Sequence, residues 1–363
     1  MKHVHFVVDS VYVKRFIEVN NEIDSDSFYV FLGNEAKYLD KKQVFFLSSS
    51  AGKNIIGKII NRIKITIQLY NILRKADRVY FHYLTEFFSS LIKYLPKRII
   101  SYWLLWGADV YDRLSNFEMY DENTLKFYTT KKNKKTKKEI LCDKKVIRKI
   151  NKIGTIIDGD YELLSNEFGI KDNKIEFFYV NPLKFDNFVS NSIKHKNINI
   201  LLGNSADPAN NHISVLKSLQ RLKNVTVYCP LSYGESDYAE NVIKQGKDLL
   251  GENFIPLTEF MDQNKYLELL DSIDVGIMNH YRQQALGNIF ALLTLGKTMY
   301  INSRSPVFKF LESKGIVVHK TEEIQFNMKL ELDEDNIKNI NKEIVFDINS
   351  EIKSIEYIKN LYK

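Results

Sequence analysis

Residues 197–212 read NINILLGNSADPANNH, and this stretch decides the fold class. Its apolar half is typical of a short strand, and its polar half ends where a helical pattern begins. In an open parallel α/β sheet, this order puts Gly203, Asn204 and Ser205 at the carboxyl edge of the sheet. Ligands bind at that edge, and helix amino termini there favour phosphate. An Asx-rich turn with a helix N-cap explains the same residues, so spacing alone leaves both interpretations open.

The alternation of strand, loop and helix repeats on both sides of this stretch. Downstream, strands are expected at 225–229, 254–256, 275–278 and 298–301, with helices at 212–222, 238–250, 264–271 and 285–295. Upstream, strands are expected at 3–8, 28–32, 43–47, 78–82, 99–105 and 154–157. This alternation predicts parallel, doubly wound sheets, and 363 residues suffice for two cores. We therefore expect α/β Rossmann-like domains at 1–185 and 186–345, and a C-terminal helix within 346–363 that can cross back to the first domain.

Composition narrows the class of protein. Apolar residues make up 44% and charged residues 27% of the chain, which is typical of a soluble globular protein. No uncharged apolar run reaches the ~18 residues of a membrane span, and the amino terminus lacks the pattern of a signal peptide. We therefore expect a cytoplasmic protein. Cys142 and Cys229 have no CxxC spacing, so neither a disulfide framework nor a cysteine metal site is expected.

A second polar run, NHYRQQALGN at 279–288, follows a predicted strand and opens a predicted helix. Arg282 can form paired bonds with phosphate, and Gln283 and Gln284 lie where helix N–H groups are free. Gly287 and Asn288 occupy positions where a structural helix would prefer Ala or Leu. The pattern favours a ligand site over a solvated helix cap.

Four further residues are weaker candidates. Tyr233 and Glu259 follow strands of the second series and are candidate contacts to a base, a ribose or a sugar. In the first series, His82 ends a strand, and Asp109 follows an apolar strand and a Gly-Ala pair. Either can act as a general base toward a hydroxyl. A structural histidine and an N-cap aspartate are the ordinary alternatives.

Charge patterns suggest two more surfaces. Residues 131–149 carry ten Lys or Arg side chains, which favours a polyanionic partner or a solvated face. A predicted helix at 54–70 combines regularly spaced isoleucines with flanking Lys53, Lys58, Arg62 and Lys64. Such a helix can lie in an anionic membrane interface, or its isoleucine face can simply be core. Asp158-Gly159-Asp160 matches the Asp-x-Asp pattern of metal sites but is more typical of a turn, so no metal is expected.

Several of these pieces occur together, in order, in one known family. The shared pieces are Phe81-His82, Trp106–Tyr111, Gly159-Asp160, Ile200–Asn204 with Ser205 and Asp207, Asn211–Ile213, Pro230 with Tyr233, and Arg282–Gln284 with Gly287. On these residues the chain resembles the bacterial TDP-4-acetamido-4,6-dideoxygalactose (TDP-N-acetylfucosamine) transferases of the enterobacterial common antigen pathway, the 4-α-L-fucosyltransferase family, glycosyltransferase family 56. Ala206 stands where the family pattern has glycine, and 279–281 is more polar than the pattern, which leaves the donor sugar open.

The resemblance implies a GT-B-like fold, in which two Rossmann-like doubly wound domains face a cleft. It also implies a TDP-sugar donor and an undecaprenyl-diphosphate-linked glycan as acceptor, with no cofactor and no required metal. The enzyme would be peripheral on the inner face of the cytoplasmic membrane. By position, Gly203, Asn204, Ser205, Arg282, Gln283, Gln284 and Gly287 would surround the donor. His82 and Asp109 would face the acceptor.

Two alternative functions compete with this interpretation. A GT-B transferase that uses a UDP- or GDP-sugar in capsule or O-antigen assembly would have the same sequence features. A nucleic-acid-binding protein would use the lysines of 131–149, but that block has no interleaved aromatic residues, and the Arg-Gln-Gln run would then have no use. We therefore expect a nucleotide-sugar transferase with no nucleic-acid partner.

Overall fold

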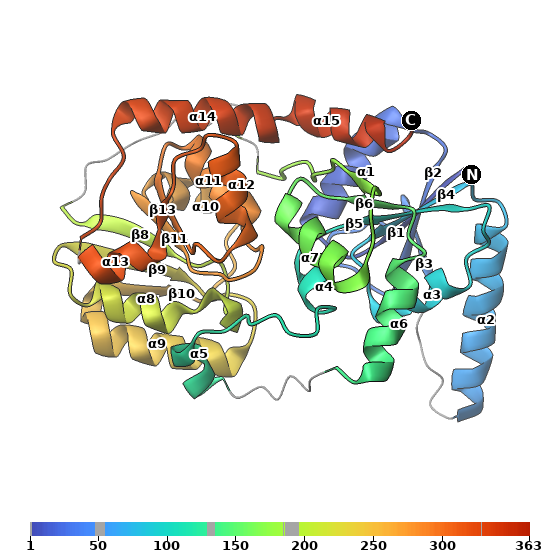
Figure 1. Ribbon diagram of the computed structural model, residues 1–363, viewed down its shortest axis with the longest axis horizontal. Coiled ribbons are helices and arrows are strands. Elements are labelled where there is room, and N and C mark those ends of the chain that lie inside the picture. Colours follow the sequence, from blue (N-terminus) through green and yellow to red (C-terminus); the bar gives the residue numbers. More distant parts are fainter. Residues whose placement is uncertain (1, 48–54, 129–134, 184, 186–195, 328) are drawn as a thin grey trace. The chain divides into compact units, whose positions relative to one another are not determined.

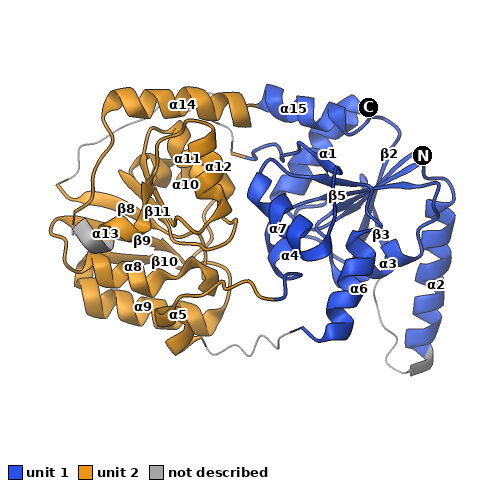
Figure 2. Cartoon of the chain, in the orientation of Figure 1, with its two compact units in different colours: residues 1–115, 135–182, 351–363 blue, residues 116–134, 183–350 orange. Residues whose placement is uncertain are grey.

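The computed structural model describes residues 2–47, 55–128, 135–183, 185, 196–327 and 329–363. The chain forms two compact units, shown in Figure 2. Unit 1 comprises residues 1–115, 135–182 and 351–363, and unit 2 comprises residues 116–134 and 183–350. This partition differs from the expected domain of 1–185, because residues 116–134 belong to unit 2.

Unit 1 contains a seven-stranded parallel sheet (Figure 1). Its strands are β1 (His3–Val7), β2 (Ser27–Leu32), β3 (Val44–Leu47), β4 (Arg78–His82), β5 (Ile100–Leu104), β6 (Lys152–Gly154) and β7 (Lys174–Ile175). Their order is β3-β2-β1-β4-β5-β6-β7. The chain builds outward from β1 to β3 and then returns to add β4 on the other side of β1. The expected doubly wound sheet is confirmed, and its switch point lies between β1 and β4.

Helices cover both faces of this sheet. They are α1 (Val11–Ile23), α2 (Ile55–Leu73), α3 (Glu86–Lys93), α4 (Ala108–Tyr111), α6 (Lys137–Ile147), α7 (Asp158–Phe168) and α15 (Glu351–Asn360). The C-terminal helix α15 packs against α1, and α3 packs against α6. Between the layers lies an aromatic core that includes Phe6, Phe81 and Trp103, each fully buried. Burial of such rings contributes much of the stability of the unit.

Unit 2 repeats the arrangement with six parallel strands. They are β8 (Ile198–Leu202), β9 (Val225–Pro230), β10 (Phe254–Leu257), β11 (Val275–Met278), β12 (Thr298–Ile301) and β13 (His319–Lys320), in the order β10-β9-β8-β11-β12-β13. The strands expected from the second series are present within a residue or two. The switch point lies between β8 and β11, which start the loops that the sequence singles out.

The helices of unit 2 lie on the two faces of this sheet (Figure 1). They are α5 (Glu122–Phe127), α8 (His212–Leu219), α9 (Ser236–Leu250), α10 (Gln263–Asp271), α11 (Leu286–Thr294), α12 (Pro306–Ser313), α13 (Thr321–Asn327) and α14 (Asp335–Asn349), with short 3-10 turns η1 (Pro208–Asn210) and η2 (Gly251–Asn253). Helices α8 and α9 cover one face, and α10, α11 and α12 cover the other. Beneath α8 and α9 lies an aliphatic core that includes Ile200, Leu216 and Val227.

Specific contacts explain why residues 116–134 join unit 2. Helix α5 packs on α8. At its start, the Asp121 N–H donates to Asn211 Oδ1 at 2.9 Å, and at its end the Tyr128 ring stands edge-on to Tyr238. The partner residues lie 90 and 110 positions away in the sequence, so local patterns do not reveal the pairing.

The isoleucine stripe of α2 is not core. Its side chains at Ile59, Ile60, Ile63 and Ile67 are between 53% and 60% exposed. Helix α2 instead packs through Leu69, Ile72 and Leu73 on its C-terminal half. The core interpretation of this face is therefore wrong, because unit 1 is covered by a different stripe of the same helix. Lys53 and the side chains of residues 55 and 56 lie outside the described residues.

Two further charge features can be placed. No helix among the described residues is long and apolar enough to cross a membrane. Of the basic block at 131–149, residues 131–134 lie outside the described part of the chain, and most of the remainder forms α6. There Asp143 pairs with Lys135 and with Arg113 Nη1, the latter at 2.8 Å. Part of this block is thus neutralised inside unit 1.

Candidate functional site

Two loops begin side by side at the switch point of unit 2. The β8 loop (residues 203–211) follows Leu202, and the β11 loop (residues 279–285) follows Met278. Strands β8 and β11 are paired in register up to Leu202 and Ile277, and the Gly203 N–H donates to the Ile277 carbonyl at 2.9 Å. Both loops therefore leave the carboxyl edge of the sheet together, where open α/β folds bind ligands.

Asn210 fixes the shape of the β8 loop. Its Oδ1 accepts the Asn204 N–H at 3.0 Å, and its Nδ2 donates to the carbonyls of Ser205 and Asp207 at 3.1 and 2.9 Å. The same Oδ1 lies 2.7 Å from Nε2 of His280, which joins the two loops. Burial, with the nearby Arg282 charge, lowers the pKa of His280 well below its usual value, so this ring is neutral and donates from Nε2. One buried amide thus organises both loops.

Gly203 is required at the start of the β8 loop for two reasons. Its φ of +71° is a conformation that side-chain-bearing residues rarely adopt. A Cβ at this position would also lie 2.5 Å from His212 Nε2 and 2.6 Å from Asn210 Oδ1. The glycine lets the backbone pass directly over these two polar side chains.

Replacing Gly203 with alanine is expected to destabilise unit 2 by more than the ~1–2 kcal/mol cost of a left-handed alanine, because the loop must also move off His212 and Asn210. Gly315→Ala is the control in the same unit: Gly315 also has a positive φ, +81°, but the nearest atom to its added Cβ is Ile344 Cδ1 at an ordinary 3.7 Å. Urea unfolding of both variants measures the difference. Equal losses would show that the close contacts at Gly203 have no energetic consequence.

Arg282 projects from the β11 loop onto the β8 loop. Its Nη2 donates to Asp207 Oδ2 at 2.6 Å, and the guanidinium is largely buried. The Ser305 hydroxyl donates a hydrogen bond to the backbone carbonyl of Arg282 at 3.2 Å. Arg282 Nε is buried and has no hydrogen-bond partner within the described residues. The pair with Asp207 therefore uses only part of the donor capacity of this side chain.

Asn204 links three predicted site residues into one chain of hydrogen bonds. Gln284 Nε2 donates to Asn204 Oδ1 at 3.0 Å, and Asn204 Nδ2 donates to the hydroxyl of Tyr233 at 3.0 Å. Tyr233 itself is more than half exposed. The loop that carries it is held by an Ala206 N–H bond to the Tyr233 carbonyl at 2.7 Å. The structure thus brings together side chains 29 to 80 residues apart in sequence.

The amino terminus of α11 completes this constellation. Ala285 precedes the helix with φ +59° and supplies no side-chain cap. The first turn, which contains Gly287 and Asn288, therefore presents N–H groups at the positive end of the helix dipole. Buried polar atoms around the two loops that have no partner among the described residues include Arg282 Nε, Gln284 Oε1 and His212 Nε2. Buried polar atoms are normally paired, so this arrangement is typical of a site for a polar, anionic ligand.

Three other candidates from unit 2 are Ser205 and Gln283, which lie in the two loops, and Glu259, which lies outside them. Ser205 is buried, and its hydroxyl accepts the Asp207 N–H at 3.3 Å, so it stabilises the loop. Gln283 is partly buried in the β11 loop. Glu259 follows the edge strand β10, is exposed, and forms no hydrogen bond or ion pair with the described residues.

Asp109 in unit 1 is a buried acceptor of three hydrogen bonds. Its carboxylate accepts from the Leu84 N–H at 2.9 Å, from Trp103 Nε1 at 2.7 Å and from the Trp106 N–H at 3.1 Å. Burial raises its pKa, opposed by these bonds. Only 2% of the residue is exposed. The contacts tie the segments after β4 and β5 together and do not present the carboxylate to an acceptor.

His82 is enclosed in the same unit. Its Nε2 lies 3.0 Å from His5 Nδ1, its Nδ1 lies 2.9 Å from the Tyr179 hydroxyl, and the side chain is fully buried. Burial lowers its pKa to about 3, so the ring is neutral. A general base must reach the proton that it removes. The base role of His82 or Asp109 stays a prediction, and the observed contacts are structural.

The Asp-x-Asp segment at 158–160 forms the first turn of α7. Asp160 is buried and accepts the Tyr111 hydroxyl at 2.6 Å, and Asp158 pairs with Lys174. These bonds account for both carboxylates in structural terms. Among the described residues, no group of His, Cys, Asp and Glu is placed to hold a metal ion.

The sequence analysis assigned no role in the site to four residues that shape it, although Asp207 and His212 lie within the family motifs. Asp207, Asn210, His212 and His280 hold the two loops or border the unpartnered polar atoms. Their only local signal is the density of Asx and His residues near the two strand ends, which is equally typical of a turn. Which side chain bonds which backbone group depends on the pairing of β8 with β11.

A comparison with protein families assigns the chain. The family described as 4-alpha-L-fucosyltransferase, glycosyl transferase group 56, matches residues 73–354. The chain belongs to this family. It is therefore a glycosyltransferase, as the sequence motifs predicted. Both loops and all the candidate residues lie inside the matched range, whereas α2 lies almost wholly before it.

Solved structures support the fold of this glycosyltransferase. A glycosyltransferase from Rickettsia africae matches with a TM-score of 0.67 at 12% identity, covering 100% of this chain and 98% of that one. Anabaena HepE in complex with UDP and glucose matches with a TM-score of 0.66 at 11% identity, covering 100% and 98%. MnaA of S. aureus with UDP gives 0.59 at 12% identity, covering 100% and 96%. The expected GT-B-like class, with two Rossmann-like sheets, is confirmed.

Proposed function

We propose that this glycosyltransferase moves a deoxyamino sugar, 4-acetamido-4,6-dideoxygalactose or a similar sugar, from a TDP-sugar to an undecaprenyl-diphosphate-linked saccharide. The product would enter a bacterial surface polysaccharide of the enterobacterial common antigen or O-antigen type. The proposed donor site rests on one observation: buried polar atoms of Arg282, Gln284 and His212, beside the amino terminus of α11, have no partner among the described residues. Membership of the family supports the reaction class.

The donor diphosphate would lie between Arg282 and the first turn of α11. A guanidinium and free helix N–H groups both favour phosphate oxygens. Their value in catalysis is greatest as the bond between the anomeric carbon and the diphosphate breaks, because negative charge then builds on the departing TDP. Asn204, Gln284 and Tyr233 would contact the sugar or the nucleoside, since their linked amides and hydroxyl border the same loops.

Transfer requires one proton to leave the acceptor. The acceptor oxygen forms a bond to the anomeric carbon, the bond to the diphosphate breaks, and a base takes the hydroxyl proton. Asp109 and His82 are the residues proposed for that role. Either would need to become accessible, because the structure buries both side chains. Because the chain offers candidate bases in Asp109 and His82, we propose inversion at the anomeric carbon.

A lipid-linked acceptor requires contact with a membrane. The exposed isoleucines of α2 lie on a helix that has basic side chains and no acidic one between Ile55 and Leu73. An amphipathic basic helix of this kind can rest in the interface of an anionic bilayer, with its apolar face among the headgroups. We therefore propose peripheral attachment to the inner face of the cytoplasmic membrane through α2.

The nucleotide preference can be measured directly. TDP at ~100 times its Kd is expected to stabilise unit 2 by about 2.7 kcal/mol, seen as a rise in Tm of several degrees. UDP and GDP at the same concentration should give much smaller shifts. A larger shift with UDP or GDP would contradict the proposed donor and favour the alternative of a UDP- or GDP-sugar transferase. Mass analysis of products from a panel of nucleotide sugars and a lipid-diphosphate saccharide would identify the transferred sugar.

A further inference from the structure

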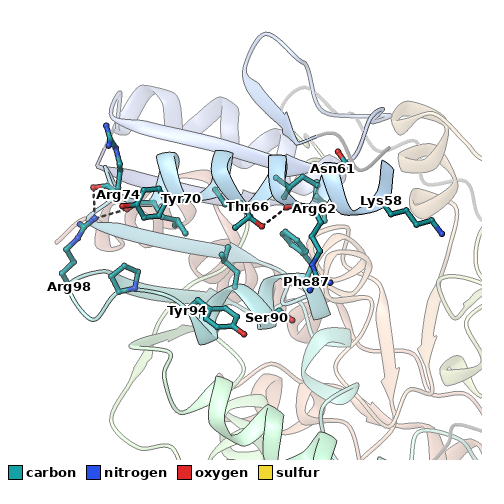
Figure 3. A pocket seen from close by; sticks show the side chains of 16 residues that line it. Lys58, Asn61, Arg62, Thr66, Tyr70, Arg74, Phe87, Ser90, Tyr94 and Arg98 are labelled. Carbon is teal, nitrogen blue, oxygen red and sulfur yellow. Dashed lines mark hydrogen bonds between the residues drawn. The ribbon is translucent and has the colours of Figure 1, made fainter. Parts of the chain in front are cut away.

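A groove of about 880 Å³ separates α2 from α3 in unit 1 (Figure 3). Its apolar walls come from α2, from α3 and from the turn before β5, and include Ile65, Leu69, Leu73, Phe87, Leu91 and Pro96. The volume lies within the range of small-molecule sites, ~300–1,000 Å³. None of the residues singled out for the donor or the acceptor lines this groove.

The groove has cationic ends and no acidic lining residue. Lys58 and Arg62 lie at one end, and Arg74 and Arg98 lie at the other (Figure 3). Arg98 is committed to structure, since it donates to the carbonyls of Ala76, Leu73 and Arg74 at 2.7 to 3.1 Å. Lys58 and Arg62, by contrast, form no side-chain hydrogen bond or ion pair with the described residues. These two cations are available to an anion.

The topology distinguishes the two ends. Lys58 and Arg62 lie in the first turns of α2, which follows β3, and Phe87 near them lies in the first turn of α3, which follows β4 (Figure 3). This end of the groove therefore lies toward the carboxyl edge of the sheet, where substrates bind in α/β folds. The opposite end, at Pro96 and Arg98, precedes β5 and lies toward the amino edge. An anionic head at the first end would bring an attached saccharide toward the functional edge of unit 1.

The outer face of α2 continues the apolar surface. The exposed isoleucines lie beside the groove, and Tyr70, two-thirds exposed, lines its margin. Exposed apolar side chains that gather on one face typically mark a site of interaction with a protein or a membrane. A second copy of the chain would bring basic α2 against basic α2, and a purely polar polyanion would leave the isoleucines without a role. The chemistry fits an amphiphile with an apolar chain and an anionic head.

We propose that this groove binds the prenyl chain of the lipid-diphosphate acceptor, with the diphosphate at Lys58 and Arg62. The inference rests on the proposed lipid-linked acceptor. The chain lies against the walls contributed by α2 and α3, and the isoleucine face rests in the membrane from which the lipid enters. This site would select acceptors by their lipid carrier and would not touch the donor.

Paired variants test the groove against matched controls. Lys58→Gln combined with Arg62→Gln removes the head contacts, and Ser90→Phe fills the groove from an exposed position. Lys75→Gln combined with Lys97→Gln removes two charges, and Asn71→Phe adds one ring, at exposed positions near the groove that do not line it. The groove variants are expected to lower kcat/KM for a prenyl-diphosphate-linked saccharide ~10-fold or more. Their kcat/KM for the same saccharide without lipid, and the Tm shift with TDP, should stay unchanged. Equal effects on both acceptors, or in the controls, would overturn the proposal.

Photolabelling gives an answer independent of turnover. A prenyl diphosphate with a diazirine on its chain is expected to label peptides of α2 and α3, and unlabelled prenyl diphosphate should compete. Labelling elsewhere, or equal competition by phosphatidylglycerol vesicles or inorganic diphosphate, would overturn the assignment.

Different results would contradict the proposed function and the proposed lipid groove. A wild-type enzyme that is labelled in the groove but transfers nothing to lipid-linked saccharides contradicts the proposed function. A wild-type enzyme that transfers but is not labelled there contradicts the groove.

Discussion

Replacing Arg282 with alanine is expected to lower kcat/KM for the nucleotide-sugar donor by on the order of 100-fold or more. The variant removes the cation proposed to face the diphosphate. Arg282 Nη2 lies 2.6 Å from Asp207 Oδ2 in the wild type. Without this partner, the Asp207 carboxylate becomes an unneutralised negative charge beside the phosphates. Steady-state kinetics with varied donor, together with titration of TDP, measures both consequences.

Two comparisons separate an electrostatic role from a structural one. Arg221→Ala is the surface control, because Arg221 is exposed in unit 2 and its side chain forms no hydrogen bond or ion pair with the described residues. Asp207→Asn keeps the Arg282 charge but weakens its anchor, so it should cost less than Arg282→Ala. Because the two residues touch, Arg282→Ala combined with Asp207→Ala should cost less than the sum of the single losses. Unchanged kinetics in Arg282→Ala, with normal TDP binding, would remove this residue from the donor site.

Patterns along the chain were sufficient to select most of the side chains that the structure brings together at the proposed donor site. Asn204, Arg282 and Gln284 each follow a predicted strand, and the carboxyl end of such a strand lies at the ligand edge of a parallel sheet. The β8 and β11 pairing then brings them together. Hydrophobic periodicity allows this prediction because the alternation of strands and helices along the chain is visible in the local sequence. The family resemblance rested on the same residues.

Other features depend on tertiary pairing that no local pattern contains. The proposed bases His82 and Asp109 follow strands as expected, yet both are buried beneath neighbouring segments, because Tyr179 and Leu84 supply partners from elsewhere in the chain. Helix α2 shows a related limit. The helical spacing of its isoleucines correctly predicts a helix with an apolar face. The spacing does not indicate whether the rest of unit 1 covers that face.

Buried histidines should make both units sensitive to mild acid. The pKa values of His82 in unit 1 and His212 in unit 2 are lowered to about 3 by burial. In the unfolded chain a histidine titrates near 6.5. Between pH 6.5 and 3 the unfolded state therefore binds more protons than the folded state, so the free energy of unfolding falls as the pH falls. Burial also lowers the pKa of His5 and of His280, which adds to the effect in each unit.

Lowering the pH from 7 to 5 is expected to reduce the free energy of unfolding by about 2 kcal/mol for each such histidine. The two units can be followed separately. The chain has two tryptophans, Trp103 and Trp106, and both lie in unit 1. Tryptophan fluorescence during urea unfolding therefore reports unit 1 alone, whereas far-UV circular dichroism reports both units. A free energy of unfolding that is the same at pH 7 and pH 5 would contradict the prediction.

Variants with opposite expected signs make this test specific. His82→Gln removes a group that titrates only in the unfolded chain, so unit 1 should lose less stability on acidification, whatever the stability of the variant at pH 7. His319 behaves in the opposite way, because its hydrogen bond to Asp333 at 2.9 Å raises its pKa. The stability that His319 contributes is present below pH 6.5 and is lost as the pH rises through its folded pKa. His319→Gln should therefore steepen the acid loss in unit 2 while His82→Gln flattens it in unit 1, a pair of outcomes that a general effect of net charge cannot produce.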